Sequence, residues 1–186
     1  MTPGRRYRVR HGRTAWNRLR YIGWRDEPLD DIGRTQARAL AAQLARQPID
    51  VVYSSPLSRA VDTARPLAQT HGVPLQLRDG LKEIDYGDYQ DVLKVQRKLR
   101  LRRQHRKRPL PGGESLRDLF DRVAPVRVEV ESELLTGRHV AVVAHFWSLR
   151  MFAGQVDGLS FDEVLARDDY SPENGVATSR FGARAS

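Results

Sequence analysis

Hydrophobic positions along the chain follow two alternating patterns, one typical of buried strands and one typical of amphipathic helices. Short runs that favour strands occupy residues 6–10, 49–55, 73–77 and 138–145. Apolar residues recur at helical spacing over 34–46, 57–72, 116–135 and 147–156. Strands that alternate with helices predict an α/β fold, here a three-layer α/β/α sandwich with a mostly parallel central sheet.

Several residues mark where the predicted helices begin, bend and end. Ser115 precedes the pattern of 116–135, so it is predicted as the N-cap of that helix. Pro125 is expected to bend the same helix, and Pro66 is expected to interrupt or kink the helix over 57–72. Gly72 closes that second pattern and is the residue type that commonly ends a helix.

The length and composition of the chain favour one globular domain over residues 1–186. The 186 residues are enough for one well-buried core, and 40% of them are hydrophobic. No apolar run is long enough to span a membrane, and no apolar stretch follows the charged N-terminus, so we expect neither a membrane segment nor a signal peptide. The chain contains no cysteine, which excludes disulfides and thiolate catalysis. We expect a cytoplasmic location.

The positive charge of the chain is concentrated in one segment. The net charge is +9, and residues 94–108 hold nine Lys or Arg and no acidic residue. The remaining 23 Lys and Arg balance the 23 Asp and Glu. Residues 90–106 are predicted to form a strongly basic helix, within an insertion near residues 90–110. Three interpretations of segment 94–108 stay open: a solvated arm, a pocket border that attracts acidic substrates, and a nucleic-acid-binding surface.

Polar residues follow three of the predicted strands at the point where each strand ends. His11 follows the first strand, Ser55 and Arg59 follow the second, and His145 ends the strand over 138–145. Ligand sites in parallel sheets lie beyond the carboxyl ends of the strands. We therefore expect these polar residues, far apart in the sequence, to meet at one edge of the sheet.

Five motifs in order over residues 10–150 resemble those of the histidine phosphatase superfamily, which is phosphoglycerate-mutase-like. They are "RHGRTAWN" at 10–17, "SSPLSRAVDTA" at 54–64, "EIDYG" at 83–87, "PGGES" at 111–115 and a strand that ends at His145. The block at 54–64 matches the family pattern in full and is the most specific of the five.

The resemblance implies a phosphoryl-transfer site without a metal or cofactor. By this resemblance the catalytic residues are His11, as the nucleophile that attacks phosphorus, and Glu83, as the acid that protonates the leaving oxygen. The phosphate-binding residues implied are Arg10, Asn17, Arg59 and His145.

The resemblance further implies a metal-independent phosphomonoesterase that hydrolyses a small phosphorylated metabolite through a phosphohistidine. Phosphoglycerate mutases of the family carry a longer insertion ahead of the "PGGES" motif. Only 23 residues lie between Gly87 and Pro111 here, which favours hydrolysis over mutase-type transfer. Two alternatives stay open, a phosphoglycerate-mutase-type phosphoryl transfer and a non-catalytic relative that binds an anion or nucleic acid.

The sequence departs from the family pattern at positions close to the expected site. Arg13 stands where the family usually has Glu, which reverses a charge. Phe146 and Trp147 follow His145, where the family has small residues that let the backbone approach phosphate. We expect at least one of the two rings to turn away from the pocket. Arg8, in the middle of the first strand, is expected to be solvated or paired with an acid.

Overall fold

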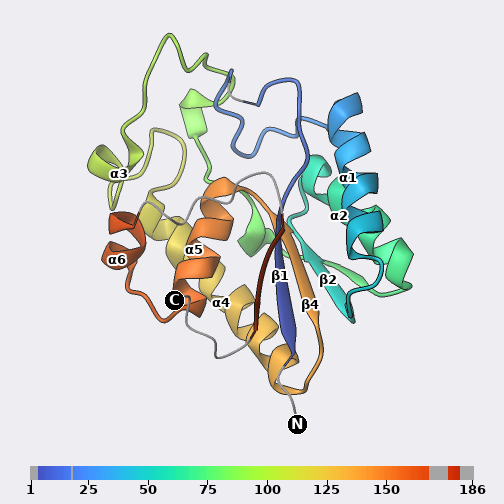
Figure 1. Cartoon of the computed structure of the whole chain (residues 1–186). Helices are drawn as coiled ribbons and strands as arrows, with labels where there is room; N and C mark the ends of the chain where they lie inside the picture. The colour runs from blue at the N-terminus through green and yellow to red at the C-terminus, as the bar shows by residue number, and fades with distance from the viewer. Residues whose placement is uncertain (1–3, 18, 168–175, 181–186) are drawn as a thin grey trace.

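The computed structural model describes residues 4–17, 19–167 and 176–180, which form a five-stranded sheet flanked by helices (Figure 1). The strands are β1 (Arg5–Arg10), β2 (Val51–Ser54), β3 (Leu75–Leu77), β4 (Val140–Ala144) and β5 (Val176–Arg180). Their order across the sheet is β3-β2-β4-β1-β5. The first four pair in parallel and β5 is antiparallel to β1, so the predicted mostly parallel sheet is confirmed.

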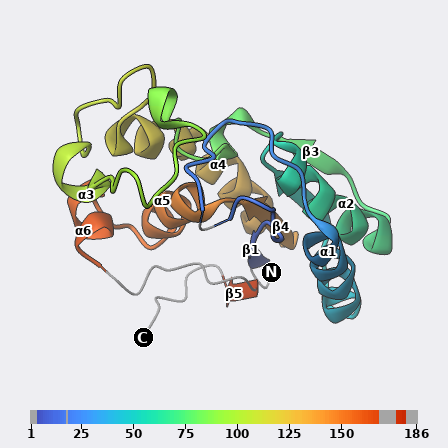
Figure 2. The ribbon, with the colours of Figure 1, turned by 90° about the horizontal axis from the view of Figure 1, so that it is seen from above.

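The helices form one layer on each face of this sheet. They are α1 (Asp31–Leu44), α2 (Ser58–His71), α3 (Leu101–Gln104), α4 (Leu116–Leu135), α5 (Phe146–Val156) and α6 (Phe161–Ala166), with 3₁₀ turns at Asp79–Leu81 and Gly87–Tyr89. Seen from above, α1 and α2 lie on one side of the sheet and α4 and α5 on the other (Figure 2). The predicted three-layer α/β/α sandwich is therefore confirmed. None of the helices in the described part of the chain is long and apolar enough to cross a bilayer.

The two faces of the sheet bury separate apolar clusters. All five residues of the central strand β4 are apolar and buried. Its Ala141 and Val143 pack with Leu67 on the α1–α2 side, whereas Val140 and Val142 belong to the larger cluster that includes α4 and α5. Because apolar side chains pack against both faces of β4, the residues that follow this strand are held in position.

The predicted helix N-cap is confirmed, and the predicted interruption at Pro66 is wrong, whereas a kink at Pro66 and a bend at Pro125 stay predictions. The Ser115 backbone N–H donates to Asp118 Oδ2 at 2.9 Å, and Asp118 N–H donates to Ser115 Oγ at 3.1 Å, which is a reciprocal capping box. Helix α2 runs without interruption through Pro66 and ends at Gly72, whose φ of 62° lies in the left-handed region. Residues in the middle of both proline-containing helices are fully buried, so tertiary packing outweighs the local preference.

The predicted basic helix over residues 90–106 is wrong, because only α3 within it is helical. Like charges at helical spacing repel, and nine cations without an acid give this segment no compensating pairs. The chain here is instead held as a loop against residues that follow the first motif. Tyr21 N–H donates to the Val92 carbonyl at 3.1 Å, and Arg20 and Leu93 form an isolated β-bridge. Helix α6 and strand β5 were not predicted.

The Ser115→Ala substitution is expected to lower the free energy of unfolding by about 1 kcal/mol, because it removes the side-chain half of the α4 capping box. Urea unfolding of both proteins measures the difference. Ser132→Ala, in the interior of the same helix, is the matched control and is expected to change stability by less than about 0.5 kcal/mol. Equal effects of the two substitutions would contradict a capping role for Ser115.

Candidate active site

A pocket of about 350 Å³ lies at the edge of the sheet where the parallel strands end. Five of the six predicted site residues line it: Arg10, His11, Asn17, Arg59 and Glu83. They come from the end of β1, the loop after it, the first turn of α2 and the segment after the 3₁₀ turn at Asp79–Leu81. The fold thus brings polar residues from distant parts of the sequence together at one edge of the sheet, as the order of strands and polar residues predicted.

The imidazole of His11 is held in one orientation and one tautomer. Its Nδ1 lies 2.7 Å from the Gly12 carbonyl oxygen, which can only accept, so Nδ1 carries the hydrogen. The lone pair is therefore on Nε2. The side chain is 5% exposed, and burial, aided by Arg59 and Arg10, lowers the pKa of His11 to about 3. His11 is neutral at physiological pH, the state that a nitrogen nucleophile requires.

The backbone after His11 is fixed by close contact with two helices. Gly12 N–H donates to Thr63 Oγ1 of α2 at 3.0 Å. A Cβ at position 12 would lie 2.8 Å from the carbonyl oxygen of Gly33 in α1, so no side chain fits there. The glycine of the "RHG" motif therefore serves close packing, which sets the position of the neighbouring imidazole.

The sixth predicted residue, His145, lies next to His11 and is fully buried. The two ring centroids are 5.0 Å apart. His145 Nε2 is 2.8 Å from Ser55 Oγ, while Nδ1 is buried without a hydrogen-bond partner among the described residues. Burial, together with the nearby Arg59 and His11, holds the pKa of His145 well below its usual range. His145 is not among the residues that line the pocket, so it lies beside His11 and behind the pocket wall.

Arg10 and Arg59 are two of the cationic residues that line the pocket. Arg59 is 1% exposed and donates from Nη1 to the Arg25 carbonyl at 2.9 Å and from Nη2 to the Gly23 carbonyl at 2.7 Å. Burial lowers the pKa of Arg59 to about 10, so it stays protonated at neutral pH. Arg10 stacks over the Phe146 ring, with its guanidinium carbon 5.6 Å from the ring centroid. Arginine guanidinium groups in such fixed positions match the oxygens of a phosphate.

Glu83 is a buried carboxyl aimed at the start of α5. It is 9% exposed, and its Oε1 accepts from Ile84 N–H at 2.9 Å and from Trp147 N–H at 3.1 Å. Burial raises the pKa of Glu83, although these N–H donors and the charges of Arg10 and Arg59 oppose the shift. A carboxyl with a raised pKa can hold a proton and donate it, as a general acid must.

The departures from the family pattern have different outcomes. Arg13 turns to the N-cap of α1, where its Nε lies 2.7 Å from Asp30 Oδ2. Phe146 and Trp147 both line the pocket, and Trp147 also packs against the larger apolar cluster. The expectation that one ring turns away is therefore met only in part. Arg8 is half-buried, and burial lowers the pKa of its guanidinium, although the charge of Asp157 opposes the shift. Its Nε is buried with no hydrogen-bond partner among the described residues.

The pocket contains functional candidates that the sequence did not single out. Arg20, Tyr86 and Lys94 also line it. Burial, together with the charge of Arg10, lowers the pKa of Lys94. Lys94 begins the basic segment 94–108, and Arg102 of the same segment lies over the Trp147 ring at 5.9 Å. Of the three interpretations of that segment, the structure supports the pocket border.

The lining charges favour an anionic ligand. Arg10, Arg20, Arg59 and Lys94 are opposed by one carboxyl, that of Glu83, among the lining residues of the described chain. The side chains that the structure describes include no group of three or more His, Asp or Glu placed to hold a metal ion. The site is thus built to hold a multiply charged anion next to a neutral histidine.

Fold and site together define an α/β enzyme of the phosphatase and phosphomutase type. The chain belongs to the histidine phosphatase superfamily (branch 1), whose sequence profile matches residues 7–171. The family resemblance carried by the five motifs is thereby confirmed.

Relatives and solved structures agree on the family and differ in activity. A 2,3-bisphosphoglycerate-dependent phosphoglycerate mutase of Rhizobium johnstonii is 38% identical over 172 residues, which span 85% of this chain and 82% of the mutase. The mutase of Parvibaculum lavamentivorans is 34% identical over the same shares of both chains. The structure of a mycobacterial glucosyl-3-phosphoglycerate phosphatase in complex with VO₃ superposes with a TM-score of 0.78 at 30% identity, covering 94% of this chain and 92% of that one.

Proposed function

We propose that the protein is a phosphomonoesterase that hydrolyses a small, multiply charged phosphate ester through a phosphohistidine at His11. The observation that carries the proposal is the hydrogen bond from His11 Nδ1 to the Gly12 carbonyl. It leaves the Nε2 lone pair of a buried, neutral imidazole in a pocket that is also lined by Arg10, Arg59 and the Glu83 carboxyl, whose pKa burial raises. A metal ion has no required role in this reaction.

In the first step the His11 Nε2 lone pair attacks phosphorus and a nitrogen–phosphorus bond forms. The bond from phosphorus to the ester oxygen breaks, and its electron pair goes to that oxygen, which takes the proton of the Glu83 carboxyl. Arg10 and Arg59 stabilise the negative charge spread over the phosphoryl oxygens in the transition state. The alcohol leaves, and the phosphoryl group stays on His11.

In the second step water attacks the phosphohistidine. The Glu83 carboxylate accepts a proton from that water, the nitrogen–phosphorus bond breaks, and its electron pair returns to Nε2. Inorganic phosphate leaves with His11 neutral and Glu83 protonated, as at the start. Each group therefore acts in both steps, with Glu83 alternating between acid and base.

The short cover over the pocket favours water over a second substrate as the phosphoryl acceptor. The 23 residues between Gly87 and Pro111 contain one short helix, α3, and the rest is loop. The resemblance to the family implies that mutases use a longer insertion here to keep water from the phosphoenzyme. A short cover gives the phosphohistidine less protection from hydrolysis.

The second candidate is phosphoglycerate-mutase-type transfer, which two observations favour. Relatives at 34% and 38% identity carry that name. Lys94 and Arg20 also place positive charge in the pocket beyond the two arginines that face the phosphoryl group, as a substrate with a second anionic group requires. The ratio of hydrolysis to transfer for one substrate separates the two reactions.

The non-catalytic alternative would use segment 94–108 as a binding surface for nucleic acid. Several of its cations already have partners within the chain, among them Arg106 with Asp162 and Arg97 over the Tyr89 ring. This leaves fewer charges for phosphates of a polymer. The alternative is retained as one outcome of the tests below.

The His11→Ala variant is expected to lose hydrolysis entirely and to keep the wild-type far-UV circular dichroism spectrum, because it removes the nucleophile and little core volume. A panel of phosphorylated sugars, glycerates and nucleotides is assayed with both proteins for release of inorganic phosphate. His71→Ala, on the opposite end of α2 from the pocket, is the control and should keep full activity. Activity retained by the folded His11 variant would exclude the proposed nucleophile.

The pH dependence of kcat/KM, which reports the pKa values of the free enzyme, is expected to fall on both sides of an optimum. His11 must be neutral, so activity is lost as the pH falls through about 3. Glu83 must be protonated, so activity is lost as the pH rises through its raised pKa. Glu83→Gln should lower kcat by about 10²–10⁴-fold and remove the alkaline limb. Asp88→Asn, a change of a neighbouring carboxyl, should keep that limb, and its loss in this variant would reassign the acid.

Replacing Arg100, Arg102 and Arg103 together with Gln is expected to raise KM for a substrate with two anionic groups, because the segment borders the pocket. KM for a substrate with a phosphate alone should change less. Both values are measured at low and high salt, since screening weakens attraction between separated charges. Unchanged KM values with a steep, salt-dependent loss of nucleic-acid affinity would favour the binding-surface alternative.

A further inference from the structure

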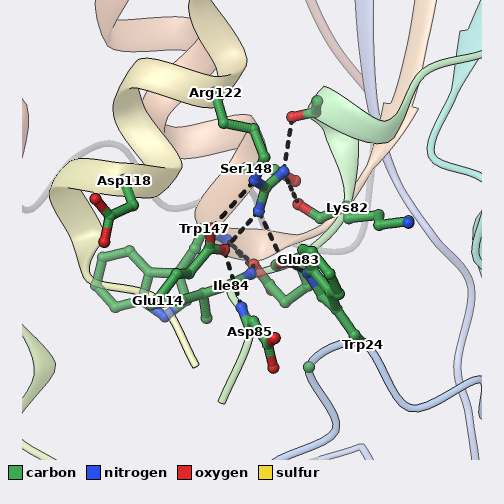
Figure 3. Close-up of polar contacts among 12 residues, drawn as sticks. Trp24, Lys82, Glu83, Ile84, Asp85, Glu114, Asp118, Arg122, Trp147 and Ser148 are labelled. Atoms are coloured by element: carbon green, nitrogen blue, oxygen red, sulfur yellow. Dashed lines mark hydrogen bonds and ion pairs between the residues drawn. The ribbon is translucent and has the colours of Figure 1, made fainter. Parts of the chain in front are cut away.

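An ion pair outside the pocket holds the loop that carries Glu83. Arg122 lies in α4, and its guanidinium group reaches the segment from Asp79 to Glu83, while Glu114 lies in the "PGGES" motif (Figure 3). We propose that Arg122, paired with Glu114, is a positioning residue for the Glu83 acid. The inference rests on the proposed function, in which Glu83 protonates the leaving oxygen.

Arg122 binds one backbone carbonyl after another along the loop. From Nη1 it donates to the carbonyl oxygens of Asp79 at 3.2 Å, Gly80 at 2.9 Å and Lys82 at 3.1 Å. From Nη2 it donates to the carbonyl oxygen of Glu83 itself at 3.0 Å. A single planar group thus fixes the backbone from the 3₁₀ turn up to the proposed acid (Figure 3).

Glu114 completes the arrangement from the other side of Glu83. It accepts from Arg122 through both oxygens, at 2.6 Å from Nη2 and 3.2 Å from Nε. Its Oε1 also accepts from Asp85 N–H at 2.9 Å, and its own N–H donates to the Asp85 carbonyl at 3.1 Å. Residues on both sides of Glu83 are therefore tied to one bidentate ion pair.

The indole of Trp24 adds a third contact to the same carbonyl. Its Nε1–H donates to the Glu83 carbonyl at 2.7 Å, so this oxygen accepts from both Trp24 and Arg122. The Trp24 ring also stacks with two cations, Lys82 Nζ at 4.8 Å and the Arg122 guanidinium at 5.7 Å. Trp24 lies on the loop after the first motif, so its hydrogen bond ties Glu83 to the segment that follows β1 and includes His11.

Burial alone does not position the Glu83 carboxyl for proton transfer, and the contacts of Arg122 and Glu114 meet this second requirement. A buried carboxyl keeps its proton, but it transfers that proton only when it lies within hydrogen-bond distance of the leaving oxygen. A displacement of about 1 Å in such a group can cost about 10²-fold in rate. Lysine, with one ammonium group, cannot form the same planar set of contacts. Arg122 and Glu114 are 19% and 14% exposed, so the pair is largely protected from solvent.

A comparison of two leaving groups separates positioning from a general role in stability. For an alkyl phosphate such as glycerol phosphate, the leaving oxygen needs a proton, and Arg122→Gln should lower kcat/KM, which covers the steps through formation of the phosphohistidine, about 10²-fold. For 4-nitrophenyl phosphate, whose leaving group departs without a proton, the same variant should change kcat/KM by less than about 3-fold, because formation of the phosphohistidine then needs no acid. Arg122→Lys should lie between the wild type and Arg122→Gln.

Arg127→Gln is the matched control for this comparison. Arg127 also lies in α4 and also pairs with a glutamate, Glu131, but within the described part of the chain it makes no hydrogen bond to the Glu83 loop. It should leave kcat/KM for both esters unchanged. In a Glu83→Gln background, Arg122→Gln should cause little further loss, since a positioning residue acts through the group it positions.

Equal losses on the two esters, or losses of Arg122→Gln and Glu83→Gln that add, would overturn the proposal. If the wild type hydrolyses neither ester, the proposed function fails and the positioning claim is tested without turnover. Amide hydrogen exchange is then measured at Ile84 and Trp147, the two donors to the Glu83 carboxyl. Exchange at both should be at least about 10-fold faster in Arg122→Gln than in Arg127→Gln, and equal rates would contradict the positioning role.

Discussion

Removal of two ionisable groups from water, the His11 imidazole and the Glu83 carboxyl, is the constraint on which the rest of the site depends. Burial is the largest contribution to the lowered pKa of His11 and to the raised pKa of Glu83. Arg10 and Arg59 act on Glu83 in the opposite sense, because a nearby cation favours a charged carboxyl. The lowered pKa of His11 and the raised pKa of Glu83, which the proposed roles of these residues require, therefore depend on loops that exclude water.

Water is excluded by loops and helix ends that meet at the same edge of the sheet. The tight contact of Gly12 with α1 fixes the loop after β1, and the ion pair of Arg122 and Glu114 fixes the loop that carries Glu83. The backbone N–H of Trp147, in the first turn of α5, aligns the carboxyl from the opposite direction. Phe146 contributes its ring face to the Arg10 guanidinium, so a large residue next to His145 supports an arginine of the pocket.

The sequence predicted the parts of this structure that depend on short-range pattern and strand order. The apolar run that became β4, the N-cap at Ser115 and the meeting of His11, Arg59 and His145 near one edge follow from local chemistry and from the parallel sheet. Glu83 was identified only through the family resemblance. The basic segment was misjudged because charged residues have no periodicity that separates a helix from a loop fixed by tertiary contacts. The link from Arg122 to Glu83 could not be predicted, since it joins backbone carbonyls to a side chain about 40 residues away.

The central claim, that phosphorus passes through His11, is tested most directly by trapping the covalent intermediate. The enzyme is mixed with a ³²P-labelled ester that it hydrolyses, quenched in base within a single turnover, and digested for peptide mapping. The account predicts a base-stable, acid-labile phosphoryl group on the peptide that contains His11, which disappears as inorganic phosphate is released. A single-turnover reaction that releases phosphate with no labelled peptide, or with the label on a peptide lacking His11, would contradict it.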